Sequence, residues 1–197
     1  MISFAENIFK FPRIYEFKIK ILNHLNNLDS FSVEHIIKNK KILDIGCGSL
    51  QFYYDPKNTS SRTAIDASPE MIEASRALYP HSNYQIASAE KLPFFEKSFN
   101  VVTFFFVLHH IDAKKWELVL AEAKRVTTDE VLILDHTQND NFFLAFIQRV
   151  YWHFFDGGKI YRKEYEWDHL LSGFKIKEYK RTGLLFKNIC YYRLSIN

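Results

Sequence analysis

The sequence has few cysteines, little net charge and no long apolar run. Its two cysteines, Cys47 and Cys190, have neither the spacing of metal ligands nor that of a redox motif, so we expect reduced thiols and a cytoplasmic location. No window approaches the about 20 apolar residues that cross a bilayer. We therefore expect no transmembrane segment, and the early acid Glu6 argues against a signal peptide. A net charge of +3 is too small to indicate a nucleic-acid partner.

What is present has the size and composition of one globular domain, with 197 residues, of which 47% are apolar and 25% charged. Apolar runs alternate with amphipathic segments, which predicts an α/β fold with a parallel sheet. The predicted strands are 41–45, 63–67, 84–87, 101–107, 131–135, 175–181 and 188–196. The predicted helices are 14–28, 31–37, 68–80, 114–126, 141–155 and 164–171. We expect the single domain to comprise N-terminal helices (1–38), a ligand-binding core (39–137), a helical cap (138–163) and a C-terminal helix with a strand pair (164–197).

A glycine-rich segment ends the apolar run that begins at Lys41. Asp44 precedes the glycines Gly46 and Gly48, and the next apolar run ends at Asp66. In a parallel sheet this layout places a bare backbone turn at the end of one strand and a carboxylate at the end of the next. Such a site is typical of an adenosine-containing ligand, whose ribose hydroxyls bind the carboxylate.

Two classes of ligand share this geometry. A nicotinamide or flavin site has a third glycine three residues after the second, and Gln51 stands there, so that fingerprint fails. Asp44, inside the loop, would repel a pyrophosphate but attract an ammonium group, directly or through water. The loop therefore favours a ligand that carries a positive charge.

Four blocks in order resemble the motifs of the class I S-adenosylmethionine-dependent methyltransferases, in particular the small-molecule subset that includes the quinone-biosynthesis methyltransferases. The blocks are Leu43–Gly48, Ala64–Met71, Ala87–Phe94 with Ser98–Val102, and Val107–Ile111. The resemblance implies a Rossmann-like, doubly wound sheet of seven strands, mostly parallel with the last strand antiparallel. It also implies S-adenosyl-L-methionine as the cofactor and methyl transfer to an O, N or C atom of a small, partly apolar molecule.

The resemblance further implies which residues form the site. Those expected to bind the cofactor are Asp44, Gly46, Cys47, Gly48, Asp66, Ala67, Met71, Ser88, Ala89, Glu90 and Phe106. His109 and His110 follow the fourth strand, where the acceptor would meet the methyl group, and are the candidates for a base or an orienting group. His136, after the fifth strand, is a further candidate, and no metal is expected.

Two alternatives stay open. Leu50 and Ser88 stand where the family commonly has a glycine and an acid, and Pro56 shortens the first helix. These departures suit a regulatory or partner protein that binds the cofactor without catalysis. A nucleotide-dependent oxidoreductase is the second alternative. Phe105–Leu108 lacks the Asp/Asn-Pro-Pro-Tyr pattern of nucleic-acid amino-methyltransferases, so we expect a small acceptor and no nucleic acid.

The predicted cap carries an apolar stripe at helical spacing. Its members are Phe143, Phe146, Ile147, Val150 and Phe154. The stripe can be buried against the sheet edge, or it can roof a pocket over His109 and His110. Because the cap follows the fifth strand, at the carboxyl edge where open α/β sheets bind ligands, its position favours the roof. A Phe-rich roof predicts an apolar or aromatic acceptor.

Overall fold

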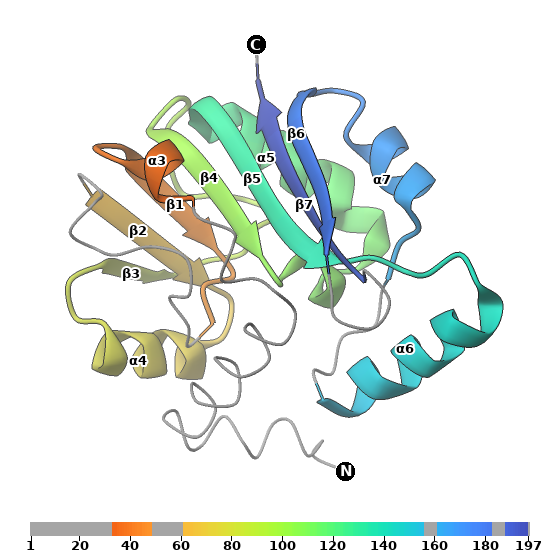
Figure 1. The fold of residues 1–197 in the computed structure, drawn as a ribbon. Helices are drawn as coiled ribbons and strands as arrows, with labels where there is room; N and C mark the ends of the chain where they lie inside the picture. The colour runs from red at the N-terminus through yellow and green to blue at the C-terminus, as the bar shows by residue number, and fades with distance from the viewer. Residues whose placement is uncertain (1–32, 49–60, 156–160, 183–187, 197) are drawn as a thin grey trace.

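A single mixed sheet organises the part of the chain that the computed structural model describes, which is residues 33–48, 61–155, 161–182 and 188–196. Its seven strands lie in the order β3-β2-β1-β4-β5-β7-β6 (Figure 1). The strands are β1 (Lys41–Ile45), β2 (Ser61–Asp66), β3 (Asn83–Ile86), β4 (Phe99–Phe105), β5 (Thr127–His136), β6 (Lys175–Thr182) and β7 (Ile189–Ser195). The helices are α3 (Glu34–Ile37), α4 (Pro69–Leu78), α5 (Trp116–Val126), α6 (Phe142–Phe155) and α7 (Glu164–Leu170), with short 3₁₀ turns η3 (Leu108–His110) and η4 (Ala113–Lys115). The predicted helix over 14–28 lies outside the described residues.

The strand directions confirm the predicted fold. The ladders that join β3, β2, β1, β4 and β5 are parallel, whereas β7 runs antiparallel to both β5 and β6. Register places Asp44 of β1 beside Ala64 of β2 on one side and Thr103 of β4 on the other. Paired residues in a parallel ladder point to the same face of the sheet, so this register decides which side chains meet.

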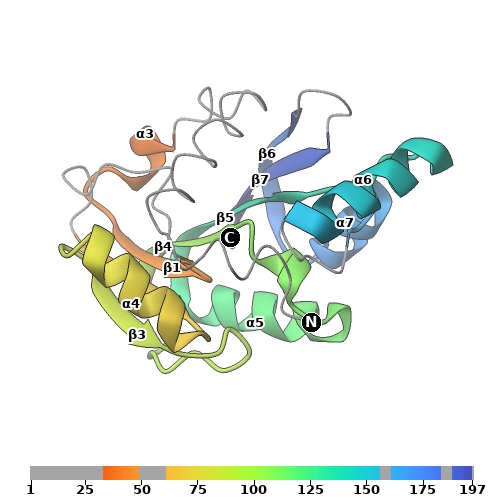
Figure 2. The same cartoon turned by 90° about the horizontal axis from the view of Figure 1, so that it is seen from below.

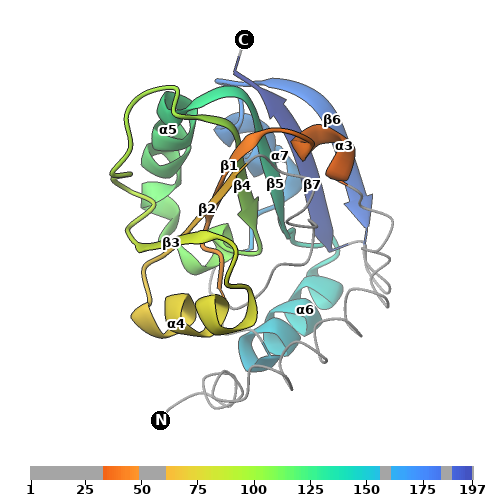
Figure 3. The same ribbon diagram turned by 90° about the vertical axis from the view of Figure 1, so that its left-hand side faces the viewer.

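Helices cover both faces of the sheet, as Figure 3 shows with α5 on one side and α3 on the other. The central strands are therefore nearly continuous apolar runs, which is what strands buried on both faces require. The cluster under α5 and α7 includes Leu43, Ile45, Ile65, Val102, Phe104, Trp116, Val119, Trp167 and Leu171. The cluster under α3 includes Ile36, Ile37, Ile42, Val101, Leu132, Leu134, Ile189 and Tyr191.

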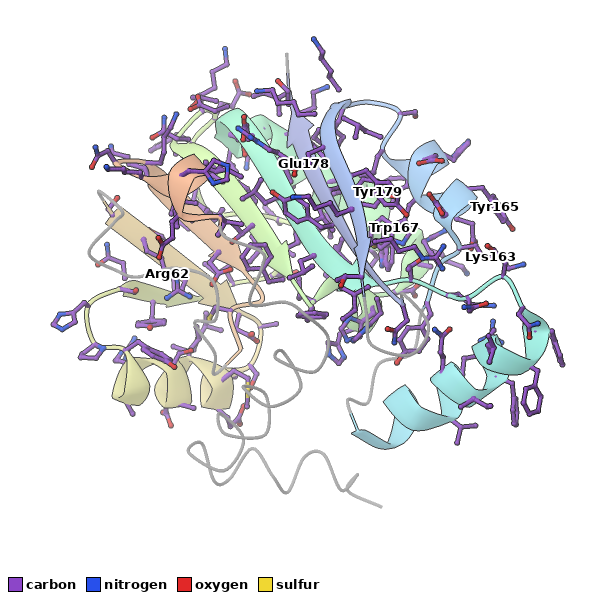
Figure 4. All side chains as sticks on the ribbon, viewed as in Figure 1. Arg62, Lys163, Tyr165, Trp167, Glu178 and Tyr179 are labelled. Atoms are coloured by element: carbon purple, nitrogen blue, oxygen red, sulfur yellow. The ribbon has the colours of Figure 1, made fainter. Side chains whose placement is uncertain are left out.

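Aromatic rings fix the C-terminal helix to the sheet. Trp167 of α7 lies with its ring centroid 5.0 Å from that of Trp116 and 5.8 Å from that of Tyr192. Tyr179 of β6 continues the contact at 4.8 Å from Tyr192, and Figure 4 labels Trp167 and Tyr179 beside these strands. Strand β7 is thus part of the core, and the edge strand β6, none of whose residues is buried, packs on it through Tyr179.

Helix α6 is the part of the fold that the sequence analysis misjudged. The helix forms where predicted, but it stands apart from the sheet beyond the end of β5 (Figures 1 and 2). Phe143 and Phe146 of its apolar stripe are 67% and 57% exposed, and Ile147 and Val150 are exposed as well. The expectation that this stripe is buried is therefore wrong for these residues.

The reason is the direction in which the helix faces. Ala145 and Gln148 are the side chains that α6 buries in its described part, and Gln148 Oε1 accepts a hydrogen bond from the Asn139 backbone N–H at 2.9 Å. A polar contact thus seats the helix, and its apolar side is turned outward. Periodicity identifies an amphipathic helix but does not say which side meets the body of the protein.

Candidate functional site

The loop after β1 is held in a conformation that only glycine adopts easily. Gly46 and Gly48 have φ values of +68° and +51°, in the left-handed region. The backbone N–H groups of Gly46 and Cys47 both donate to the Ile65 carbonyl, at 2.8 and 3.0 Å. A Cβ on Gly46 would lie 2.0 Å from a methyl carbon of Val107, so the loop packs directly on the segment that follows β4.

Gly48 differs from Gly46 in what surrounds it. No atom of the described residues lies within 4 Å of the position that a Cβ on Gly48 would occupy, so as far as these residues go the backbone there borders open space. Its carbonyl accepts a hydrogen bond from the Ser75 hydroxyl of α4, which ties the loop to that helix. Bare backbone next to open space is what a closely approaching ligand requires.

Asp66 ends β2 beside this loop. Its Oδ2 accepts from the Gly48 N–H at 3.0 Å and its Oδ1 from the Ser68 N–H at 2.9 Å. Burial raises the pKa of Asp66, and the hydrogen bonds from Ser68 and Gly48 only partly offset that effect. Asp66 is thus a partly buried carboxylate, orientated by backbone donors and with lone pairs left for further donors.

The start of α4 explains why Asp66 is not used as a helix cap. Ser68 Oγ accepts from the Met71 N–H at 3.3 Å, and Pro69 occupies the first helical position. Met71 lies in this first turn and is partly exposed, whereas Ala67 is exposed. The cap therefore leaves the Asp66 side chain turned toward the loop.

Asp44 lies beneath the loop, in a buried polar cluster. Its carboxylate pairs with the Arg62 guanidinium of β2, labelled in Figure 4, and accepts from the Thr103 hydroxyl of β4 at 2.8 Å. Asp44 is 4% exposed and Arg62 5% exposed. Residues on the two neighbouring strands thus hold Asp44 in place, and a contact between Asp44 and a ligand ammonium stays a prediction.

The segment after β3 carries the next predicted residues. The Ala87 N–H donates to the Asp66 carbonyl at 3.0 Å, which places this segment beside the end of β2. Ser88 is exposed, and its hydroxyl oxygen accepts from the Glu90 N–H at 3.2 Å. Glu90 pairs with Lys115 at 2.8 Å, and Ala89 packs on the core beneath. Their contacts with an adenine ring stay predictions.

A buried histidine–carboxylate pair lies after β4. His109 Nδ1 is 2.6 Å from Oδ1 of Asp135, which ends the apolar run of β5. Both side chains are at most 1% exposed. Burial by itself would raise the pKa of Asp135, but attraction to His109, its hydrogen bond and the neighbouring His136 outweigh this effect and hold that pKa below its usual range.

Further rings surround this pair. The His109 ring centroid is 4.0 Å from that of His110 and 4.7 Å from that of His136. The ring centroid of His136 lies 5.9 Å from that of Tyr161 and 5.0 Å from that of Phe106. Phe106 has a φ of +54°, an uncommon conformation for a bulky residue, and its N–H donates to the Leu134 carbonyl at 2.7 Å. His110 is the histidine of this group that is exposed.

Comparisons with known proteins bear on the family and the fold of the chain. Residues 43–134 match the methyltransferase domain family. They form a class I S-adenosylmethionine-dependent methyltransferase domain. The finer likeness to the quinone-biosynthesis methyltransferases is not established by this match. No curated protein matches the chain at a significant level.

Solved structures show the same fold over most of the chain. One is the complex between the Trm112 methyltransferase activator and a methyltransferase from Haloferax volcanii, with a TM-score of 0.74 and 13% identity, covering 98% of this chain and 97% of that one. Magnesium protoporphyrin IX methyltransferase from Synechocystis, with bound S-adenosylhomocysteine, has a TM-score of 0.63 and 13% identity and covers 100% and 89%. A methyltransferase from Aquifex aeolicus has a TM-score of 0.61 and 19% identity and covers 86% and 87%.

The residues of this methyltransferase domain fit its cofactor. Gly48 borders open space, and the Asp66 carboxylate beside it is a suitable acceptor for two ribose hydroxyls. No group of three or more His, Cys, Asp or Glu side chains suited to hold a metal ion occurs among the described residues. In the same part of the chain, no helix is long and apolar enough to cross a membrane.

The sequence analysis missed three residues of this domain. Arg62 and Thr103 bind Asp44, and Asp135 binds His109. Asp135 carried a usable signal, because it is an acid that ends an apolar strand, as Asp66 does. Arg62 and Thr103 carried none, because their importance follows from the register of the sheet.

Proposed function

We propose that the chain transfers a methyl group from S-adenosyl-L-methionine to an O, N or C atom of a small, partly apolar acceptor. The observation that carries the proposal is the link between Gly48 and Asp66, which combines bare backbone and an orientated carboxylate beside open space. When bound, the cofactor supplies an electrophilic methyl group on a sulfonium. Transfer is an in-line displacement, so the protein mainly has to align the two reactants and exclude water.

Each part of the site has a defined task in this proposal. Asp66 accepts hydrogen bonds from the ribose hydroxyls, and Gly48 allows the close approach. Met71, Ala89 and Phe106 supply apolar contacts. Ser88 Oγ and the Glu90 segment supply polar groups on the adenine side. Asp44, fixed by Arg62 and Thr103, is the proposed partner of the ammonium group of the cofactor.

His110 is the proposed contact with the acceptor. It follows β4 in the turn η3, next to the loop that packs on Val107, and it is exposed where His109 is fully buried. A neutral imidazole takes a proton from a hydroxyl or an acidic carbon at physiological pH. Phe106, His136 and Tyr161 surround this region with rings, which favours an apolar or aromatic acceptor over a sugar.

Binding and transfer are tested in two steps. S-adenosylhomocysteine should raise the melting temperature of the protein and give a measurable heat in calorimetry, whereas NAD should do neither. Radiolabelled S-adenosyl-L-methionine with a panel of phenols, amines and carbon acids then tests transfer. Failure to bind S-adenosylhomocysteine would refute the proposal. Binding without product on any acceptor would favour the non-catalytic alternative.

A further inference from the structure

The buried carboxylate of Asp135 makes several hydrogen bonds to the segments that follow β4 and β5, on the proposed acceptor side of the site. Oδ2 of Asp135 accepts from the Leu108 N–H at 2.8 Å and from the His109 N–H at 3.4 Å. Its Oδ1 is bonded to His109 Nδ1 at 2.6 Å and accepts from the His136 N–H at 2.6 Å. A single side chain on β5 thus anchors the start of η3, the ring of His109 and the end of its own strand.

The chemistry of the carboxylate determines the state of the His109 ring. The backbone N–H groups of Leu108, His109 and His136 all donate to the Asp135 oxygens, which favours the ionised form, and an ionised carboxylate only accepts hydrogen bonds. Nδ1 of His109 must therefore carry the hydrogen of the 2.6 Å contact. A neutral His109 is then the Nδ1–H tautomer, as in other carboxylate–histidine pairs.

The fixed ring of His109 in turn restricts the position of His110. The two rings lie 4.0 Å apart between centroids, tilted by 43°, so the buried ring is a wall against which the exposed His110 ring rests. The His110 N–H donates to the Val107 carbonyl at 3.0 Å, which closes the short turn. Any rotation of the His109 ring or shift of η3 would move His110.

We propose that Asp135 is a positioning residue of the acceptor site. It holds His109 with Nδ1 protonated, and through that ring and the η3 backbone it fixes the place of His110. This rests on the proposed function, because it assumes that His110 meets the acceptor. Asp135 itself, completely buried, touches no acceptor.

The arrangement also indicates the class of acceptor. A histidine held in place by a buried carboxylate serves a nucleophile that must lose a proton, which a tertiary amine or a thioether does not. We therefore assign an acceptor whose reacting atom loses a proton, and we take the hydroxyl of a phenol as the case to be tested. The O–H bond breaks and its proton goes to the His110 ring. The oxygen electron pair forms the bond to the methyl carbon, and the pair of the broken carbon–sulfur bond stays on the leaving thioether.

Asp135→Asn tests the assignment because it preserves shape and removes one acceptor. The new amide has one oxygen and one NH₂ group, and donors face both positions of the present carboxylate. If the oxygen stays on the Leu108 and His109 N–H groups, the NH₂ group faces Nδ1 of His109 and favours the Nε2–H tautomer. Asp129→Asn is the matched control, because Asp129 lies at the other end of β5 and pairs with Lys40.

Nitrogen-15 NMR of the histidine side chains reads the tautomer directly. In the wild-type protein, Nδ1 of His109 should be protonated from about pH 5 to about pH 9, in whichever charge state the ring adopts. Asp135→Asn should remove that signature and shift the His110 resonances, whereas Asp129→Asn should change neither. A wild-type His109 with unprotonated Nδ1 would overturn the proposal even if the variant failed to fold. So would unchanged His109 and His110 signals in a folded Asp135→Asn protein.

The same samples separate this proposal from the proposed function. Titration with S-adenosylhomocysteine should give the same affinity for wild type and Asp135→Asn, because Asp66 and Gly48 are unaltered. Methyl transfer to phenols should fall by about a hundredfold in Asp135→Asn. Undiminished transfer would show that Asp135 is only structural. Absent binding with an intact His109 signature would refute the proposed function and leave the Asp135–His109 geometry standing.

Discussion

The Gly48 N–H donates to Oδ2 of Asp66 over 3.0 Å, and this contact joins the loop after β1 to the acid that ends β2. Two neighbouring parallel strands thereby present one composite surface. Gly48 supplies backbone that a ligand can approach closely, and Asp66 supplies a carboxylate that can accept hydrogen bonds from the ligand. Predictions about the cofactor site follow from these two residues and from what holds them in place.

Asp66→Ala should weaken binding of S-adenosylhomocysteine while the fold survives. The substitution removes hydrogen bonds to a charged group, worth about 1.5–3 kcal/mol. Dissociation constants from calorimetry should therefore rise by about ten- to a hundredfold. Exposed Asp140 offers a matched control, Asp140→Ala, which should leave the affinity unchanged. A folded Asp66→Ala protein with wild-type affinity would exclude Asp66 from the site.

Binding should also depend on pH through Asp66. Burial raises the pKa of this carboxyl, so it begins to take up a proton at a higher pH than an ordinary aspartate of about 3.9. The protonated form accepts hydrogen bonds less strongly, so the affinity for S-adenosylhomocysteine should fall as the pH is lowered toward that pKa. Calorimetry from about pH 8 to about pH 5 measures this. The Asp66→Ala protein should lose the dependence.

The two loop glycines should respond differently to alanine. Gly46→Ala combines a left-handed backbone, about 1–2 kcal/mol, with a clash against Val107, about 1–3 kcal/mol more. Gly48→Ala meets no atom of the described residues, so it should cost only the left-handed backbone conformation, about 1–2 kcal/mol. Denaturant unfolding measures both. Equal losses of stability would contradict the different surroundings of the two residues, and Gly48→Ala should still impair ligand binding.

Arg62→Ala should destabilise the protein strongly. It leaves the Asp44 carboxylate buried without its cation, and breaking a buried pair in this way costs about 3–5 kcal/mol. The pair between Lys180 and Glu178 is more exposed, so Lys180→Ala should cost about 0–1 kcal/mol. Chemical denaturation of both variants makes the comparison. A loss in Arg62→Ala as small as that in Lys180→Ala would mean that water reaches Asp44.

The exposed side of α6 should contribute little to stability. Phe143→Ala and Phe146→Ala remove side chains that are 67% and 57% exposed, so each should change the free energy of unfolding by about 0.5 kcal/mol or less. Each should instead reduce binding of a fluorescent apolar probe. A buried aromatic residue such as Phe104 is the control, because Phe104→Ala should cost about 3–5 kcal/mol. A comparable loss in Phe146→Ala would mean that something covers the helix.

The sequence predicted the sheet well, because each of its signals is local. β1 begins and ends where predicted. The strand predicted over 101–107 forms as β4, which begins and ends earlier, at Phe99 and Phe105. Ser68 and Pro69 correctly marked the start of α4. The strand directions, including antiparallel β7, follow from the strand–helix alternation together with the family resemblance.

What the sequence could not show depends on contacts between distant residues. The partners of Asp44 lie on β2 and β4 and become neighbours only through the register of three strands. Asp135 lies near the end of β5 and His109 follows the end of β4, and the two meet because these strands are parallel neighbours. For α6, spacing revealed an apolar stripe but carried no information about where Gln148 would find its hydrogen bond.

Because both cysteine thiols are buried, their reaction with alkylating reagents reports local opening of the structure around them. Burial, with Asp44 and Asp66 nearby, raises the pKa of Cys47, and burial with Asp135 raises that of Cys190 well above its usual value. A thiol that is enclosed and uncharged does not react with alkylating reagents until its surroundings open. The rate of alkylation at Cys47 therefore times the opening of the glycine loop, and the rate at Cys190 times the separation of β5 from β7. Mass spectrometry of the two alkylation rates can thus follow local opening at two places in the protein without an added label.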